Sequence, residues 1–204
     1  MIDAQVGRIL ETLDRLNLSD NTFVVYTTDH GDTCGGHGMI DKHFIMYDDV
    51  VHVPLIARFP DRLPAGCVCN SFSSHAIDLA TTFCNLAGLD APPTFEGKNL
   101  LDMALNKTGD QRQDIFSMYQ GSQFGLYTQR MLRDRKWKYI WNCTAQDELY
   151  DMENDPAEIC NLASRNEYKN ELQRLRSRLI EWMDSIKDPM LNQWTRRQLS
   201  EGLK

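Results

Sequence analysis

The chain has 204 residues and a formal net charge of −7, with 42% hydrophobic and 25% charged residues. These values are ordinary for a globular protein that can bury a sizeable core, and no apolar run approaches the roughly 20 residues that span a bilayer. A net negative charge without blocks of like charge argues against nucleic acid and against an anionic membrane surface as partners.

The chain opens with apolar residues spaced three and four apart between positions 2 and 16, which predicts an amphipathic helix. Residues 22–28 follow as a β-branched and aromatic run without polar alternation. Such a run is typical of a strand buried on both faces of a parallel sheet. Because a helix followed by a buried strand is half of an α/β repeat, we predict an α/β fold for this part.

Residues 53–59 predict a second short strand, with Pro54 near its start. A helix is predicted over 75–87, because Ser74 can cap its beginning and Gly88 can end it. The predicted apolar face of this helix consists of Ile77, Leu79, Ala80, Phe83, Cys84, Leu86 and Ala87.

The second half contains three strand-like runs separated by turn-prone or charged residues, at 115–119, 128–132 and 137–141. Consecutive strands without helices between them indicate an antiparallel sheet. Residues 168–186 predict a long amphipathic helix, and the residues from Pro189 onward are predicted to be peripheral. The basic stretch 130–138 is interpreted as a solvated strand face.

These elements indicate two parts of the chain. We predict an α/β part over residues 1–105 and a smaller part over 106–204, made of antiparallel strands and a long helix. The polar residues 106–113 predict a surface loop at the start of the second part.

The loop that follows the first strand is the first candidate for a functional site. It contains four glycines within eight residues, and sites in α/β sheets form beyond the carboxyl ends of strands. Asp29 and His30 place a carboxylate beside an imidazole there, and both side chains can bind a divalent cation. The alternative is structural, with Asp29 capping the next turn and His30 bonded to the backbone.

Three potential cations, His37, Lys42 and His43, follow within fourteen residues of Asp29. Lysine supplies a compact positive charge, and histidine can donate a hydrogen bond or a proton, so the cluster suits an anionic substrate. Each residue alone could equally be structural. Residues 47–49 are predicted to hold this loop in place. The remaining candidates are predicted to be structural residues or turn formers: His52, His75, Asp151 and Asp155.

Six cysteines are spaced irregularly and form no CxxC pair, which argues against a zinc site and against a disulfide framework. We therefore expect free thiols that are buried or half-buried. The first sixteen residues mix charged and apolar residues and do not resemble a secretion signal. For the chain as it stands we therefore predict a cytoplasmic location.

The run 21–32 resembles the metal-binding strand of the sulfatases, which are part of the alkaline-phosphatase superfamily. The resemblance continues in order along nearly the whole chain. Its other segments are 36–43, 47–49, 53–56, 77–89, 130–133, 136–139, 148–151 and 154–162. It implies part of an alkaline-phosphatase-like α/β sheet domain, followed by a small antiparallel sheet and a C-terminal helix.

The same resemblance implies roles for four residues. Asp29 and His30 would bind a divalent metal, usually calcium in sulfatases, and the metal would stabilise charge on the sulfate oxygens. Lys42 would contact the sulfate group, and His37 would lie near the substrate. That substrate would be a sulfate ester, either a small molecule or a sugar. The nucleophile of the family is a formylglycine, made from the first residue of a Cys/Ser-x-Pro-x-Arg motif.

The sequence departs from the family pattern at the nucleophile and at part of the metal site. No Cys or Ser in the chain begins a Cys/Ser-x-Pro-x-Arg motif, and the early Asp-Asp metal ligands of the family are absent. His52 and Ala80 stand where the family usually has Arg and Pro. We therefore expect the C-terminal half of a sulfatase, with its nucleophile upstream, no catalytic residue in this chain, and no activity by itself.

A further expectation follows. A sheet that lacks neighbouring strands exposes an edge, so the chain is predicted to self-associate.

There are two alternatives to a sulfatase fragment. One is a phosphodiesterase or phosphonate monoester hydrolase of the same superfamily, whose sequence differs mainly upstream of these residues. The other is a catalytically inactive remnant.

Overall fold

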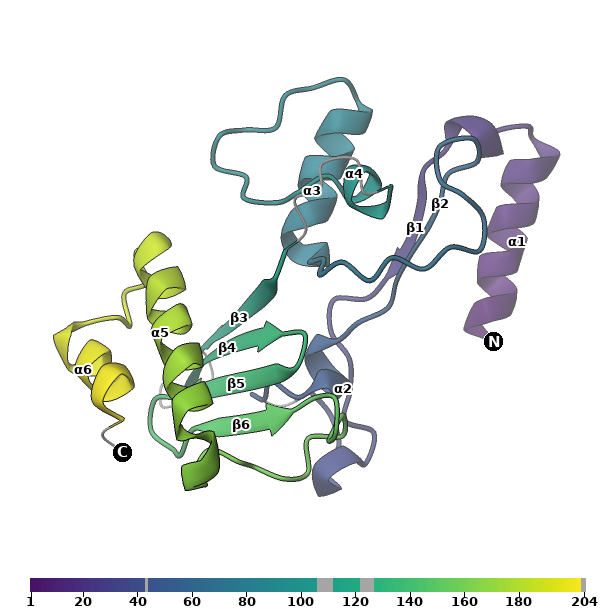
Figure 1. Ribbon diagram of the computed structural model, residues 1–204. Helices are drawn as coiled ribbons and strands as arrows, with labels where there is room; N and C mark the ends of the chain where they lie inside the picture. Colours follow the sequence, from purple (N-terminus) through teal and green to yellow (C-terminus); the bar gives the residue numbers. More distant parts are fainter. Residues whose placement is uncertain (43, 106–111, 122–126, 203–204) are drawn as a thin grey trace. The chain divides into compact units, whose positions relative to one another are not determined.

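The computed structural model describes residues 1–42, 44–105, 112–121 and 127–202 (Figure 1). The chain divides into two compact units, the first comprising 1–29 and 53–112, the second 30–52 and 113–204. The boundary expected near residue 105 stays a prediction, and the structure adds that 30–52 group with the second unit. His43 and most of the predicted loop at 106–113 lie outside the described residues.

The described residues of the first unit form four helical segments and two strands. They are α1 (Ile2–Arg15), η1 (Ser19–Asn21), β1 (Val24–Thr27), β2 (Leu55–Arg58), α3 (His75–Leu86) and α4 (Leu100–Ala104). β1 and β2 pair antiparallel, with Val24 opposite Arg58. Both predicted strands and both predicted helices are confirmed.

The burial predicted for β1 is wrong. All four of its residues keep solvent contact, and Tyr26 is 40% exposed. The predicted parallel sheet is wrong as well, because in the described part of the chain β1 pairs with β2 alone, and antiparallel. No residue of α1 is fully buried, since Ile2 and Ile9 are exposed and Val6, Leu10 and Leu13 are half-buried.

The apolar face predicted for α3 is wrong for Ile77, Phe83 and Ala87, which are exposed, whereas Leu79, Ala80, Cys84 and Leu86 are half-buried. The buried side chains of this helix are polar, namely Asp78, Thr81 and Thr82. Asp78 is responsible, because its carboxylate accepts hydrogen bonds from three groups of the same unit. The donors are the backbone N–H groups of Ser74 and Lys98 and the Arg112 guanidinium. Ser74 is the N-cap residue, but no side-chain cap hydrogen bond forms there.

The second unit is built on a four-stranded antiparallel sheet in the order β3-β4-β5-β6. The strands are β3 (Asp114–Gln120), β4 (Thr128–Asp134), β5 (Trp137–Asn142) and β6 (Glu148–Asp151). The three predicted strands are confirmed, and so is the predicted fold class, because the antiparallel sheet is followed by a long helix. That helix is α5 (Lys169–Ser185), preceded by η3 (Asn166–Tyr168) and followed by α6 (Gln193–Glu201).

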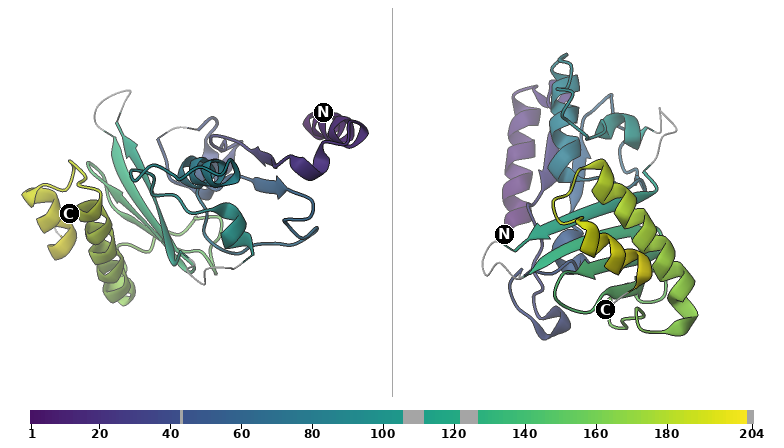
Figure 2. Two further views of the ribbon diagram at one scale, coloured as in Figure 1. Left: turned by 90° about the horizontal axis from the view of Figure 1, so that it is seen from above. Right: turned by 90° about the vertical axis from the view of Figure 1, so that its left-hand side faces the viewer.

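The two helices α5 and α6 cover one face of this sheet (Figure 2). Strand residues with inward side chains meet the stripe of α5 there, and the buried members include Trp137, Trp141, Tyr139, Leu175 and Leu179. The prediction that residues from Pro189 onward are peripheral is wrong. Asn192 caps α6 through Thr195, and Leu199 is 1% exposed within the same core.

Residues 30–52, with η2 (Gly36–Gly38) and α2 (Asp48–Val51), supply side chains to a second buried cluster of this unit. There Met46 packs with Met131, Ile140 and Tyr150 of the sheet. Since side chains of successive strand residues point to opposite faces, this second cluster lies on the face opposite α5.

The interpretation of 130–138 as a solvated basic face is wrong. Arg130 and Lys138 are both fully buried, because acidic side chains of the same unit neutralise them. The expectation of buried thiols is wrong for four of the six free cysteines, since Cys34, Cys67, Cys69 and Cys160 are exposed. Within the described residues, none of the helices has the length and apolarity to cross a membrane.

Candidate functional site

The predicted site begins where β1 ends. Asp29 is the second residue after the strand, and its carboxylate accepts a 3.2 Å hydrogen bond from the Thr28 hydroxyl. His30 follows, and with it the chain enters the second unit. The two predicted metal ligands are therefore consecutive residues at the end of a strand, as the sequence predicted.

His30 and Lys42 lie together in the second unit. The ring Nδ1 of His30 is 2.8 Å from the Gly31 carbonyl oxygen, and the ring Nε2 is 3.0 Å from the Lys42 ammonium nitrogen. A carbonyl can only accept and an ammonium can only donate, so both contacts require the neutral ring with its proton on Nδ1. The Nε2 lone pair thus points at Lys42, twelve residues away in the chain.

The loop between them is closed by backbone contacts around Thr33. This residue is 3% exposed, and both its hydroxyl and its N–H donate to the Asp41 carbonyl, at 2.8 and 3.3 Å. Asp32 accepts a hydrogen bond from the Cys34 N–H at 2.8 Å, and this bond holds the pKa of the Asp32 carboxyl below its usual value. These contacts fix the residue that precedes Lys42.

His37 has a left-handed backbone, with φ 52°, and its ring stacks on Tyr47 with ring centroids 3.9 Å apart. The Tyr47 ring in turn meets Tyr150 of β6 edge-on at 6.1 Å. Burial raises the pKa of the Tyr47 hydroxyl. The structure therefore places His37 against an aromatic side chain, whereas it places His30 against Lys42.

Asp49 holds the glycine loop close, as predicted for 47–49. A Cβ at Gly31 would lie 1.9 Å from the Asp49 carbonyl oxygen, and one at Gly36 would lie 2.1 Å from its Oδ2. The Gly31 N–H also donates to the Val50 carbonyl at 2.8 Å. Glycine is required at Gly31 because two backbones approach there within contact distance, whereas the neighbour of Gly36 is the Asp49 side chain.

Sequence reasoning missed the buried lysine that binds Asp48, next to the residue that contacts the glycine loop. Lys138 of β5 is fully buried, and its ammonium contacts the Asp48 carboxylate at 2.5 Å and the Glu158 carboxylate at 2.6 Å. Burial raises the pKa of Asp48, but hydrogen bonds from His52 and Lys138 outweigh it and hold that pKa well below its usual range. A signal existed, because Lys138 stands inside a run of Trp, Tyr and Ile without polar alternation, which is typical of a strand buried on both faces.

The prediction that Asp151 and Asp155 form turns is confirmed. Asp151 accepts hydrogen bonds from the N–H groups of Glu153 and Asn154, and Asp155 accepts from those of Ile159 and Cys160.

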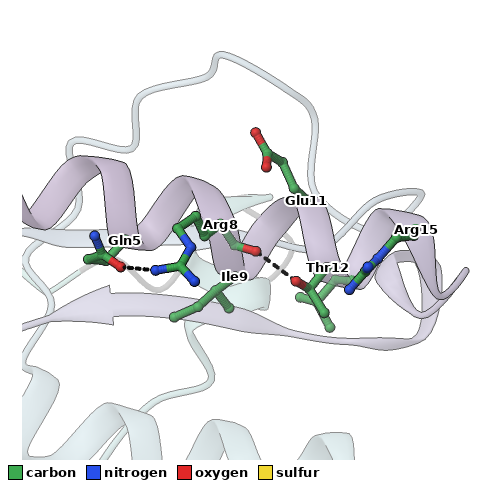
Figure 3. Close-up of a pocket in the computed structure, with 7 residues that line it drawn as sticks. Gln5, Arg8, Ile9, Glu11, Thr12 and Arg15 are labelled. Atoms are coloured by element: carbon green, nitrogen blue, oxygen red, sulfur yellow. Dashed lines mark hydrogen bonds between the residues drawn. The ribbon is translucent and has the colours of Figure 1, made fainter.

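A surface hollow runs along α1 in the first unit (Figure 3). The residues that line it all belong to that one helix: Gln5, Arg8, Ile9, Glu11, Thr12, Leu13 and Arg15. It contains none of the predicted site residues, so we assign no function to it. Across the described parts of the chain, no group of three or more His, Cys, Asp or Glu side chains is placed to hold a metal ion.

Comparison with known proteins addresses the resemblance directly. A family model described as N-sulphoglucosamine sulphohydrolase, C-terminal, matches residues 35–196. The chain belongs to this sulfatase family. The predicted resemblance is confirmed, because the match covers most of the chain and names the C-terminal part.

Individual relatives agree with this family. The sulfatase chain is 32% identical over 198 residues to the N-acetylglucosamine-6-O-sulfatase of Bacteroides thetaiotaomicron, covering 92% of the chain and 34% of that relative. It is similar to a protein solved in complex with its substrate D-glucosamine-2-N,6-O-disulfate, with TM-score 0.80 and 31% identity over 92% of the chain and 39% of that protein. The phosphonate monoester hydrolase of Agrobacterium radiobacter gives TM-score 0.81 at 26% identity, over 90% and 39%. The sulfatase chain thus spans between a third and two fifths of these proteins.

Proposed function

We propose that this chain supplies part of the metal- and sulfate-binding site of a sulfuric ester hydrolase. The observation that carries the proposal is the contact between Lys42 and His30, at the end of a strand, in a chain of the sulfatase family. In this proposal Lys42 binds the sulfate group through its ammonium, and His37 lies near the substrate. Asp29 and His30 are ligands of a divalent cation.

The residues present fit part of such a cation site. Asp29 offers carboxylate oxygens, and the Nδ1–H form of His30 offers the Nε2 lone pair, which is the form of histidine that binds metals. Calcium takes about six to eight oxygen ligands, so these two residues require further donors or water. When bound, the cation supplies Lewis-acid stabilisation of charge on the sulfate oxygens.

Lys42 is suited to an anion for a specific reason. One lone pair takes one partner, so His30 Nε2 serves either the Lys42 ammonium or a cation. If a cation takes that lone pair, the ammonium is available for a sulfate oxygen. An ammonium with three donors on a flexible stem is suited to that change of partner.

The proposed substrate is a sulfated sugar. Two observations support it, since a relative is named an N-acetylglucosamine-6-O-sulfatase and a similar structure holds a glucosamine disulfate. The family whose model matches is named for N-sulphoglucosamine. We propose calcium as the cation and a formylglycine nucleophile supplied from outside these 204 residues.

The test is direct binding to the purified chain. Manganese is a paramagnetic divalent probe, and we expect it to broaden the NMR signals of His30 and its neighbours in the wild type and less in Asp29→Asn. Asp20→Asn, at an exposed acidic residue of the first unit, is the matched control and should retain the broadening. Equal broadening in all three chains would refute the assignment of Asp29.

Sulfate binding is tested separately by isothermal titration with sodium sulfate in the presence of calcium. Lys42→Met should lose the binding, whereas Lys136→Met, at a lysine in a hairpin of the same unit, should retain it. We also expect the chain alone to leave an aryl sulfate uncleaved, because covalent catalysis requires an activated nucleophile. Turnover above the blank that disappears in Asp29→Ala would contradict this expectation.

A second candidate is a phosphonate monoester hydrolase, which the similarity to the Agrobacterium enzyme favours. Sulfate and phosphonate esters present similar tetrahedral anionic groups. The two candidates are separated by titrating the chain with methyl sulfate and with a phosphonate monoester, the tighter ligand identifying the substrate class. Binding of neither ligand, with the fold intact, would favour the third alternative, an inactive remnant.

A further inference from the structure

The second unit contains a buried lysine that the proposed function does not use. Lys138 is 0% exposed. Its ammonium donates to the Met46 carbonyl at 2.9 Å and to the Asp48 carboxylate, and it forms an ion pair with Glu158 at 2.6 Å. All three partners lie outside β5, two of them in the segment that follows the Lys42 loop.

Glu158 closes this cluster from the other side. One of its carboxylate oxygens contacts Lys138, and the other accepts a 2.6 Å hydrogen bond from the Asp48 N–H. Segment 46–48 is therefore bonded at a carbonyl, a side chain and an N–H. Burial raises the pKa of the Glu158 carboxyl, which is the expected effect of a dry environment on a charged acid.

The residues beside this segment carry the Lys42 loop. Tyr47 stacks on His37, Asp49 abuts the backbone at Gly31, and the Val50 carbonyl accepts from the Gly31 N–H. Each of these contacts starts within two residues of Asp48. The start of the loop, next to His30, is therefore held against the segment that Lys138 binds.

The other end of the loop is held through Thr33. Its hydroxyl and its N–H both donate to the Asp41 carbonyl, so Asp41, which precedes Lys42, is held beside the start of the loop. A continuous series of contacts thus runs from β5, through segment 46–50, to both partners of the His30–Lys42 pair.

We propose that Lys138, together with Glu158, is a positioning residue pair for the contact between His30 and Lys42. The inference rests on the proposed function only in treating that contact as part of the site. Lys138 touches neither residue. It acts by fixing the segment against which the loop is packed.

The test compares two buried ion pairs of one sheet. Lys138→Met removes the ammonium, and Lys138→Met/Glu158→Gln also removes a buried charge, which keeps a folded variant available if the single one unfolds. The matched control is Arg130→Met/Asp188→Asn, because that ion pair is equally buried but belongs to the adjacent strand and the opposite face.

Two measurements separate positioning from general stability. Amide hydrogen exchange reports whether the N–H groups of Gly31 and Asp48 lose protection, and we expect about a tenfold loss or more while the β4–β5 ladder changes little. The ¹⁵N shifts of the His30 ring report its tautomer, which should change from Nδ1–H alone to a mixture once Lys42 is displaced. The control should leave both readouts of the loop unchanged.

Either of two results would overturn the inference. In the first, the folded double variant keeps the protection of Gly31 and the tautomer of His30. In the second, loop and sheet lose protection together, as they would if Lys138 served only global stability. No metal, sulfate or substrate enters these measurements, so a chain that binds neither manganese nor sulfate would refute the proposed function and leave this result standing.

Discussion

Replacing Arg130 by methionine tests the most deeply buried charge pair of the sheet. The Arg130 guanidinium makes a two-pronged contact with Asp188, at 2.5 and 2.9 Å, and also donates to the carbonyls of Gln129 and Tyr119. The side chains of Arg130 and Asp188 are 0% and 1% exposed. Methionine fills similar space without charge, so the variant leaves the Asp188 carboxylate buried beside an apolar side chain.

The expected cost is about 3–5 kcal/mol, the range for removing one partner of a buried ion pair. This is a large part of the roughly 5–15 kcal/mol that stabilises an ordinary domain. Arg130→Met/Asp188→Asn should recover about 1–3 kcal/mol of it, because the uncompensated charge is then gone. Arg197→Met removes an exposed pair with Glu201 and should cost well under about 1 kcal/mol.

Urea unfolding followed by tryptophan fluorescence is the assay. All four tryptophans lie within 113–204, so the signal reports the second unit rather than the first. The midpoint should fall while the slope stays constant, which identifies a change in stability. If Arg130→Met costs no more than Arg197→Met, the description of this pair as buried and stabilising is wrong.

The pH dependence gives a second check on the same variant. Burial raises the pKa of Asp188, but hydrogen bonds from Arg130 and Met190 outweigh it and lower the pKa. In the wild type this stabilisation is present above the unfolded pKa of about 3.9 and is lost as the pH falls through the folded value. In Arg130→Met the lowering by the guanidinium is lost while burial and the Met190 N–H bond remain, so the carboxyl protonates more readily than in the wild type. The difference between the two chains should therefore shrink toward pH 4.

Two further predictions concern the loop and its anchor. Gly31→Ala should cost about 1–3 kcal/mol in the same fluorescence assay, because the new Cβ would collide with the Asp49 carbonyl; Gly7→Ala meets open space and should leave that signal unchanged. The Asp48 carboxylate, 3.6 Å from the His52 ring, raises the pKa of His52, so its stabilisation is complete below an unfolded pKa of about 6.5 and is lost as the pH rises through the folded value. Relative to His52→Gln, the wild type should lose less than about 1 kcal/mol between pH 6 and pH 8, and a gain would contradict the sign.

Most elements of the second unit were predictable from the residues alone. Strand-like runs between turn-prone or charged residues predicted three strands, and the stripe with Leu172, Leu175 and Leu179 predicted α5. These signals are local, since they depend on which side chains share a face within a few residues. The turns at Asp151 and Asp155 were predictable for the same reason.

The errors share another physical cause. Whether Arg130 and Lys138 face solvent depends on Asp188 and Glu158, which lie 58 and 20 residues further along the chain. The inward face of α3 likewise depends on Asp78 meeting Arg112. A charged side chain can be buried only where folding brings a partner, and local sequence carries no record of that partner's position.

For the candidate site the division is similar. The sequence by itself nominated Asp29, His30, His37 and Lys42, because residue types, glycine spacing and a family resemblance are all readable from the chain. Only the tertiary structure decided that His30 meets Lys42, whereas His37 packs on Tyr47. That choice depends on how a closed loop is laid against segment 46–50, and long-range contacts of β5 fix that segment.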